Sequence, residues 1–260
     1  MTKIDQVESV FFQVLEDIKD YLGDLTLVGG WLPFIYTRFL WNDLAVKTIT
    51  TTDIDFGFGD HQTKVYPKTI FEALSSLNYT ERRPKMDRLY PVVLYKAGKI
   101  PIDIITFPSV GEKSIKQFIG TQININKIEG FDFLLKHRMP INVTNKRSTH
   151  KINCPKPSAF LYHKAAIFLN RENTQKQAKD LYYIYFILRY APDLDVILKE
   201  ISLYKKQGHF KEAINNIGDY FIRKSAPGCL MVEKENGPDE YIEDVRQDIF
   251  ERFNKLIGAL

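Results

Sequence analysis

Two aspartates two positions apart are the residues of this sequence best suited to bind a metal ion. Asp53 and Asp55 lie in the run Thr-Asp-Ile-Asp-Phe at residues 52–56, which has the pattern of a short strand. Side chains two apart in a strand point to the same face, so the pair presents two carboxylates together. Carboxylates held this close raise each other's pKa unless a cation between them favours the ionised forms. A divalent cation is therefore the expected partner.

The ligand chemistry favours Mg²⁺ or Mn²⁺ over Zn²⁺. The segment around the pair offers carboxylate oxygens and has no nearby histidine or cysteine, and hard oxygen ligands select hard cations. Mg²⁺ is commonly held by one or two carboxylates together with the phosphates of a substrate. The expected ligand of such a site is a nucleotide.

Two further segments supply what a nucleotide site needs. A strand-like segment at residues 24–28 runs into Gly29 and Gly30, and the helix expected over 31–40 has a proline in its first turn. Glycines at this turn let phosphate oxygens approach the backbone, and the start of the helix favours negative charge. Asp103 is a single carboxylate within an apolar, strand-like run. We expect it to be a third metal ligand or a base.

Each of these motifs also has a purely structural interpretation. A Gly-Gly pair is most often a turn, and paired carboxylates are common on solvated strand ends. A lone aspartate can cap a helix or lie at the rim of a site. The order of the motifs, each on an apolar strand followed by a turn or a helix, favours one joint site.

In this order, the motifs resemble those of the nucleotidyltransferase superfamily of the DNA polymerase β type. The resemblance implies that the aspartate pair binds the metals that carry a nucleoside triphosphate such as ATP, and that the glycine pair contacts phosphate. It also implies that Asp103 helps to activate the acceptor hydroxyl. The spacing between Gly30 and Asp53 is longer than is usual in the family, so we expect an inserted loop around residues 41–49.

Two charged residues further along the chain bear on the same site. Lys164 lies at the edge of an apolar helical stripe that Ser158 can cap, and Asp180 precedes the apolar run 181–188. An acid in that position needs a partner or a capping role. An ion pair between Lys164 and Asp180 is the interpretation that follows from spacing.

A second resemblance extends the first to this part of the chain. Lys164 on an apolar helix, followed by the sequence Lys-Asp-Leu-Tyr that contains Asp180, resembles the AbiEii-like branch of bacterial nucleotidyltransferases over residues 25–190. In that branch the helix lysine contacts the nucleotide phosphates and the Asp-Leu-Tyr motif completes the site. Nucleotide-binding roles follow for Lys164 and Asp180. Members of the branch often act as toxins, which implies an antitoxin as a partner.

Composition predicts a soluble enzyme of one large or two ordinary domains. The 260 residues are 44% hydrophobic, enough to form a core. Cys154 and Cys229 are the only cysteines, which excludes a disulfide framework and suits a reducing cytoplasm. The first residues lack the apolar core of a signal peptide, and the run 181–188 is too short to span a bilayer. We therefore expect a cytoplasmic protein with no membrane partner.

The net charge of +4 is compatible with a polyanionic partner without requiring one. Basic clusters at residues 81–88 and 146–151 lie in expected loops. They could hold a triphosphate or RNA, and a solvated loop explains them equally well. Neither has the interleaved aromatic residues of a platform for single strands.

The hydrophobic pattern changes near residue 150 and predicts an α/β (α+β) fold of two lobes. With the resemblance above, we expect the first, residues 1–150, to be a nucleotidyltransferase domain with a mixed sheet, and the second, residues 151–260, to be a helical domain that closes the nucleotide cleft. Besides the segments above, the expected elements of the first lobe are helices at 5–21 and 63–77, a hairpin of 89–95 and 99–107 that turns at Ala97-Gly98, and strands at 122–125, 141–144 and 150–153. Those of the second are helices at 158–169, 175–190, 194–204, 210–220 and 239–257, with a loop around Pro227-Gly228.

Together with the metal site expected from the residues, the resemblance implies a metal-dependent nucleotidyltransferase, of EC 2.7.7 type, that moves a nucleoside monophosphate to an acceptor hydroxyl. Asp53, Asp55 and Asp103 are the expected catalytic and metal-binding residues, with Mg²⁺ or Mn²⁺ as cofactor. The acceptor is left open among RNA such as a tRNA end, a protein and a small molecule. Two other functions are left open: a metal-dependent nuclease, in which the Gly-Gly turn has no task, and an inactive nucleotide-binding module of the same fold.

Overall fold

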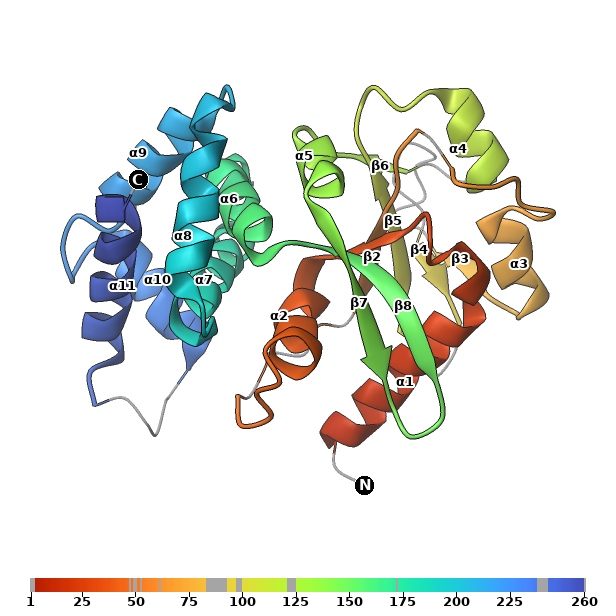
Figure 1. Ribbon diagram of the computed structural model, residues 1–260, viewed down its shortest axis with the longest axis horizontal. Helices are drawn as coiled ribbons and strands as arrows, with labels where there is room; N and C mark the ends of the chain where they lie inside the picture. The colour runs from red at the N-terminus through yellow and green to blue at the C-terminus, as the bar shows by residue number, and fades with distance from the viewer. Residues whose placement is uncertain are drawn as a thin grey trace. The chain divides into compact units, whose positions relative to one another are not determined.

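The computed structural model describes residues 3–46, 48, 51, 53–60, 62–82, 93–96, 100–120, 125–171, 173–237 and 243–259. The chain divides into two compact units, Met1–Pro155 and Lys156–Leu260 (Figure 1). The boundary expected at residue 150 lies inside the last strand of the first unit. That strand is hydrogen-bonded to both of its neighbours and so stays with the sheet up to Pro155.

The first unit is built on a mixed sheet with the strand order β3-β4-β5-β2-β1-β8-β7, and β6 pairs with β5. The strands are β1 (Thr26–Val28), β2 (Ile54–Gly57), β3 (Thr80–Arg82), β4 (Val93–Tyr95), β5 (Ile102–Thr106), β6 (Asn126–Lys127), β7 (Arg138–Thr144) and β8 (Thr149–Pro155). At its centre, β2 is parallel to β5 and antiparallel to β1. The mixed α/β class expected from the sequence is confirmed.

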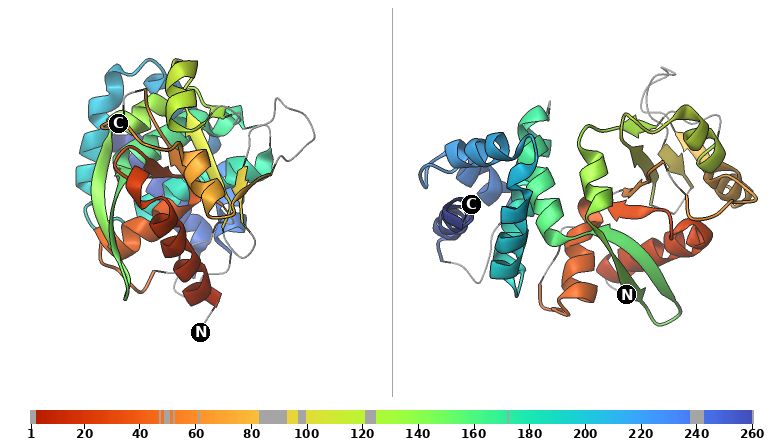
Figure 2. Two further views of the ribbon diagram at one scale, coloured as in Figure 1. Left: turned by 90° about the vertical axis from the view of Figure 1, so that its right-hand side faces the viewer. Right: turned by 45° about the horizontal axis from the view of Figure 1, so that its top comes forward.

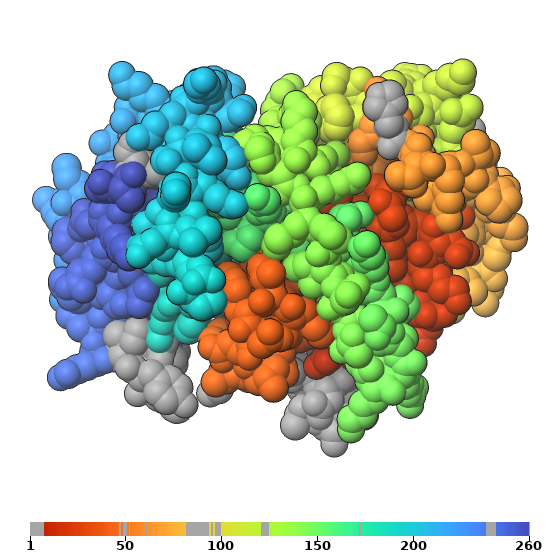
Figure 3. Space-filling model, in the orientation of Figure 1, coloured from red at the N-terminus to blue at the C-terminus, as the bar shows by residue number. Residues whose placement is uncertain are grey.

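Helices cover this sheet. They are α1 (Lys3–Asp17), α2 (Leu32–Ile35), α3 (Ile70–Ser76), α4 (Glu112–Phe118) and α5 (Phe131–Lys136). The apolar face of α1 buries Phe11, Val14 and Leu15, and the helix lies beside the β7–β8 hairpin (Figure 1, Figure 2). The side chains of that hairpin, in green, form part of the surface in Figure 3.

Two predicted helices of this unit are shorter than expected. The helix predicted at 5–21 ends at Asp17 and is followed by a separate tight turn. The helix predicted at 63–77 begins only at Ile70, because Thr69 and Glu72 form a capping box there. The residues before it contact Asp24, whose carboxylate accepts hydrogen bonds from the Thr63 backbone N–H and the Tyr66 hydroxyl.

The strand predictions are largely met, but β3 and two short helices were not predicted. β4 and β5 form the expected antiparallel pair, while its turn at Ala97-Gly98 lies outside the described residues. The strands predicted at 141–144 and 150–153 correspond to the longer hairpin β7–β8. Of the strand predicted at 122–125 only Ile125 is described, and β6 begins at the next residue. The helices α4 and α5 were not expected.

The second unit is helical, as predicted. Its helices are α6 (Pro157–Ile167), α7 (Thr174–Tyr190), α8 (Leu194–Ser202), α9 (Phe210–Tyr220), α10 (Pro227–Asn236) and α11 (Val245–Ala259). The expected loop at Pro227-Gly228 is wrong, because both residues belong to the first turn of α10. Proline is tolerated there, and Gly228 permits close packing, since a Cβ would lie 2.6 Å from the Tyr220 carbonyl oxygen.

α7 is the central helix of this unit. Its residues 181–188 are all buried, as expected for a helix that is apolar on every side. It packs against α6, α10 and α11. In the described part of the chain, no helix combines the length and the apolar character needed to cross a bilayer.

Candidate metal centre

The structure brings Asp53, Asp55 and Asp103 together near the start of β2 and β5. Each carboxylate offers one oxygen, and these oxygens lie within 4.8 Å of one another. Asp55 and Asp103 are direct partners in the parallel ladder, so their side chains leave the sheet on one face. Asp53 lies one residue before β2, two positions from Asp55, and faces the same way. All three are half-buried.

This donor set fits a hard divalent cation. All three groups are carboxylates, the ligands that Mg²⁺ and Mn²⁺ prefer. Oxygens bound to one octahedral Mg²⁺ at about 2.1 Å lie roughly 3 to 4 Å apart. Carboxylate oxygens within 4.8 Å of one another therefore need only small side-chain rotations to meet one ion.

Gly29, at the end of β1, makes room for one of these carboxylates. Val28 pairs with Asp55 across the antiparallel ladder, so the turn at Gly29 passes directly over the side chain of Asp55. Gly29 has φ of +73°, a conformation that glycine adopts without strain. A Cβ at this position would lie 1.9 Å from Asp55 Oδ2. Gly29 thus has a steric role besides the predicted phosphate contact; Gly30, which follows it in the turn, is buried.

Two side chains that sequence reasoning did not single out contact Asp53. The Trp31 indole Nε1–H donates to the Asp53 carbonyl oxygen over 2.9 Å, and the Thr51 hydroxyl donates to Asp53 Oδ1 over 2.6 Å. The one sequence signal is their closeness to the motifs, because Trp31 follows the glycine pair and Thr51 precedes Asp53 by two positions. Neither spacing by itself indicates a role.

Lys164 and Asp180 lie in the helical unit, where they form a buried ion pair. Lys164 Nζ is 2.5 Å from Asp180 Oδ1, and the two residues are 7% and 3% exposed. The ion pair inferred from their spacing is therefore present. Their nucleotide-binding roles stay a prediction.

A third charge joins this pair. Arg171 Nε donates to Asp180 Oδ2 over 2.7 Å, so the Asp180 carboxylate is ion-paired with both Arg171 and Lys164. Burial alone would raise the pKa of Asp180, but Lys164 and Arg171 outweigh burial and lower it. The cluster therefore carries one more positive charge than its carboxylate neutralises. Such a surplus suits an anionic ligand.

His163 adjoins this charge cluster and is neutral at physiological pH. Burial, with a smaller effect of Lys164, lowers its pKa to about 3. The imidazole therefore adds no charge of its own above that pH.

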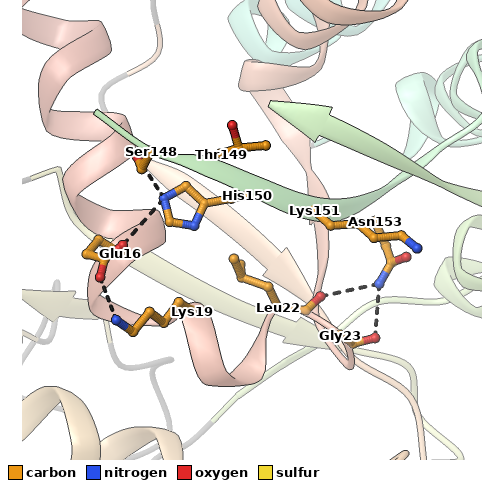
Figure 4. Close-up of a pocket in the computed structure, with 9 residues that line it drawn as sticks. All are labelled: Glu16, Lys19, Leu22, Gly23, Ser148, Thr149, His150, Lys151 and Asn153. Carbon is orange, nitrogen blue, oxygen red and sulfur yellow. Dashed lines mark hydrogen bonds and ion pairs between the residues drawn. The ribbon is translucent and has the colours of Figure 1, made fainter. Parts of the chain in front are cut away.

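The basic segment 146–151 lies beside α1 and away from the aspartates. A cavity of about 800 Å³ separates the helix from β8, with Lys151 and His150 among its lining residues (Figure 4). On the helix side Glu16 pairs with Lys19 at 2.6 Å and faces His150 Nε2 at 3.6 Å. None of the predicted site residues lines this cavity. Most of the other basic cluster, 81–88, lies outside the described residues.

Comparison with a protein-family model agrees with the expected superfamily. A sequence model of the family described as Nucleotidyltransferase matches residues 11–198, which include the three aspartates, Lys164 and Asp180. A search of curated proteins gives no match. Among solved structures, the crystal structure of an antigenic nucleotidyltransferase-like protein from Paracoccidioides brasiliensis is similar at 13% identity, with a TM-score of 0.42, over 82% of this chain and 93% of that one.

Proposed function

The chain belongs to the nucleotidyltransferase family, and on that premise we propose that it moves a nucleoside monophosphate from a nucleoside triphosphate to an acceptor hydroxyl in a metal-dependent reaction. The observation that carries the proposal is the set of three carboxylates with oxygens within 4.8 Å of one another. Like charges this close are unfavourable without a cation. The donor set suits Mg²⁺ or Mn²⁺ together with the phosphates of a nucleotide.

In the proposed reaction Asp53 and Asp55 would hold the cation, and Asp103 would complete the ligand set and orient the acceptor. A bound Mg²⁺ or Mn²⁺ would neutralise the charge that develops on the phosphate oxygens. The acceptor oxygen attacks the α-phosphorus in line and forms the new P–O bond. The bond to the bridging oxygen breaks, pyrophosphate leaves, and the hydroxyl proton passes to Asp103.

Two further groups of residues act on the phosphates in this proposal. Gly29 and Gly30 let phosphate oxygens approach the backbone of the turn. Lys164 supplies positive charge, supported by the surplus charge of its cluster with Asp180 and Arg171. The proposal thereby assigns the helical unit the role of closing over the nucleotide.

The resemblance to the AbiEii-like branch carries a finer proposal. On that basis the protein acts as a toxin, with an antitoxin as its partner and RNA, a protein or a small molecule as the acceptor. The family match does not extend to this level, so these roles stay predictions.

The reaction is tested by incubating the protein with each labelled nucleoside triphosphate, Mg²⁺ or Mn²⁺, and a cell extract. We expect one nucleotide to label an acceptor with release of pyrophosphate, and an Asp53→Ala, Asp55→Ala double variant to give no product. The labelled product identifies base and acceptor together. Hydrolysis of nucleic acid without a nucleoside triphosphate would favour the nuclease, and nucleotide binding without turnover would favour the inactive module.

Metal binding is tested separately from turnover. Mn²⁺ with a non-hydrolysable nucleoside triphosphate should raise the melting temperature, because a ligand that binds only the native state stabilises it. The double variant should lose this shift and keep an apo stability equal to or slightly above that of the wild type, since two like charges are removed. A shift that persists in the double variant would contradict the metal assignment.

A further inference from the structure

Asp53 differs from the other two aspartates in how the backbone holds it. Asp55 and Asp103 are direct partners within the β2–β5 ladder. Asp53 lies just before β2 and has no partner in that register; the first bond there joins the Ile54 N–H to the Pro101 carbonyl. The sheet therefore fixes two of the three candidate ligands. Other contacts must place the third.

The backbone of Asp53 is held by Trp31. Its indole N–H donates to the Asp53 carbonyl oxygen over 2.9 Å, and Trp31 is only 4% exposed. The ring stacks on Phe11 of α1, with centroids 4.3 Å apart and planes at 19°. It also meets Phe34 edge to face at 5.7 Å. This packing leaves the indole little freedom, so its donor fixes the position of the Asp53 carbonyl.

The carboxylate of Asp53 is held by Thr51. The Thr51 hydroxyl donates to Oδ1 over 2.6 Å, and Thr51 is 8% exposed. A hydroxyl that donates to one carboxylate oxygen sets the rotation of the group and leaves lone pairs on both oxygens for a cation. Groups that orient metal ligands in this way tune affinity without touching the ion.

We propose that Thr51 and Trp31 are positioning residues of the aspartate site, which fix the carboxylate and the backbone of Asp53 for the cation. Because Trp31 stacks on Phe11 of α1, that helix also contributes to holding Asp53 in position. Because Trp31 directly follows Gly29 and Gly30, it also joins the glycine turn to the start of β2. This inference rests on the proposed function, since it assigns the cation to Asp53.

The first experiment uses two variants of Thr51 that differ in one group. Thr51→Val keeps the shape of the side chain and removes the hydroxyl, whereas Thr51→Ser keeps the hydroxyl. Mn²⁺ affinity is measured on the full chain by calorimetry, with a non-hydrolysable nucleoside triphosphate present. We expect a loss of about 10- to 100-fold for Thr51→Val, the usual effect of removing a group that orients a metal ligand. Thr51→Ser should stay within a few-fold of the wild type.

The second experiment removes one donor from Trp31. Trp31→Phe keeps an aromatic ring on Phe11 and loses the N–H, and we expect about a 10-fold loss of Mn²⁺ affinity. Trp41→Phe is the matched control, because Trp41 is the only other tryptophan. It should bind Mn²⁺ as the wild type does. The fluorescence of Trp31, measured in the Trp41→Phe variant, should change when Mn²⁺ is added. It should not change when Asp53→Ala and Asp55→Ala are introduced into the same variant.

A third measurement separates positioning from loss of structure. Turnover of Thr51→Val should be low at limiting Mn²⁺ and return toward the wild-type value at saturating Mn²⁺, because only the affinity for the ion is changed. A general folding defect would not be reversed by the ion.

The outcomes are distinct. If the wild type binds Mn²⁺ and Thr51→Val and Trp31→Phe bind it equally well, the positioning roles are overturned and the proposed function stands. If Thr51→Ser is as weak as Thr51→Val, the hydroxyl is not the cause and the inference also fails. If the wild type binds no Mn²⁺ with any nucleotide, both the inference and the proposed function fail.

Discussion

At the scale of single residues, Gly29 shows how closely a turn is fitted to a carboxylate. Its Cα lies so near Asp55 that no side chain can be added without moving one of them. The requirement arises from the pairing of β1 with β2, which sets Val28 opposite Asp55. A Gly-Gly pair in a sequence indicates a turn. It does not tell which group lies above the turn.

Replacing Gly29 by alanine should displace Asp55. We expect turnover to fall by about 10²-fold, the effect of misplacing a catalytic group by about 1 Å. Gly130→Ala is the matched control, because Gly130 has φ of +70° and nothing within 4 Å of an added Cβ. Both variants should lose about 1–2 kcal/mol of stability to backbone strain. Equal turnover in the two would contradict a steric role for Gly29.

Asp103→Asn separates proton transfer from binding. If Asp103 acts mainly on the acceptor hydroxyl, turnover should fall by about 10²-fold or more while the affinity for nucleotide stays within a few-fold. Steady-state kinetics and a nucleotide titration on the same preparation give both values. Equal losses of binding and turnover would make Asp103 a ligand of the ground state instead.

That the three aspartates lie together could be predicted, because acidic residues inside apolar strands are unusual and their spacing follows the pleat. Thr51 and Trp31 could not, since each acts through one contact that depends on the folded chain. Trp31 donates to a backbone carbonyl 22 positions away. Because every residue has a backbone carbonyl, the residue type at the acceptor position does not reveal such a bond. A buried tryptophan beside a glycine turn is equally typical of a core.

At the scale of elements, some short helices and several helix ends could not be predicted. α7 and α9 are long and strongly patterned, and their bounds agree with the sequence to within a residue. α4 and α5 have only seven and six residues, too few for a helical period to show. The early start predicted for α3 failed because a side-chain cap, rather than periodicity, sets where that helix begins.

In the ion pair between α6 and α7, replacing Lys164 and replacing Asp180 should lower the stability by different amounts. Lys164→Met leaves Asp180 paired with Arg171, so we expect a loss of stability of about 1.5–3 kcal/mol, the range of one charged hydrogen bond. Asp180→Asn leaves two cations without their carboxylate and should lose about 3–5 kcal/mol. Denaturant unfolding measures both.

A nucleotide titration on the same variants separates structure from function. If Lys164 contacts phosphate, Lys164→Met should weaken nucleotide binding by more than its effect on stability explains. Unchanged affinity together with the stability loss would make the pair purely structural.

His163 on α6 should make the helical unit sensitive to acid. Its pKa is about 3 in the folded chain, against an ordinary value of 6.5 for an exposed imidazole. Below pH 6.5 the unfolded chain therefore binds a proton that the native chain does not, and stability falls as the pH falls. From pH 7 to pH 5 we expect a loss of about 2 kcal/mol from this group.

His163→Leu should remove that part of the pH dependence. Unfolding followed by far-UV circular dichroism at both pH values, for wild type and variant, measures the difference. His150 in the first unit also has a lowered pKa, through burial opposed by Glu16, so a smaller dependence of the same sign should persist. An identical pH response in the two proteins would contradict the prediction.

At the scale of the whole molecule, the division into a sheet unit and a helical unit could be predicted, but the order of the strands could not. Period-two and helical patterns differ within a few residues of sequence. The pairing of β1 with β8, and of β2 with β5, joins segments far apart in the chain. Those pairings depend on which faces are buried, so apart from the β4–β5 hairpin sequence patterning located strands without identifying their neighbours.

The two units offer a test of whether they act on one ligand. The aspartates lie in the first unit, and Lys164 with Asp180 in the second. If one nucleotide engages both sets, Mn²⁺ alone should slow hydrogen exchange only around β2 and β5. Mn²⁺ with a non-hydrolysable nucleoside triphosphate should also slow it in α6 and α7.

The size of the protection follows from linkage between binding and local opening. A ligand that binds only the native state, present at about 100 times its dissociation constant, adds about 2.7 kcal/mol to the free energy of opening. Lys164→Met should reduce the protection of α6 and α7 by nucleotide and leave the effect of Mn²⁺ on β2 and β5 unchanged, because the ion is assigned to the aspartates alone. Protection confined to the first unit in the wild type would mean that the helical unit does not contact the nucleotide, and would leave the carboxylate site as the whole of the nucleotide site.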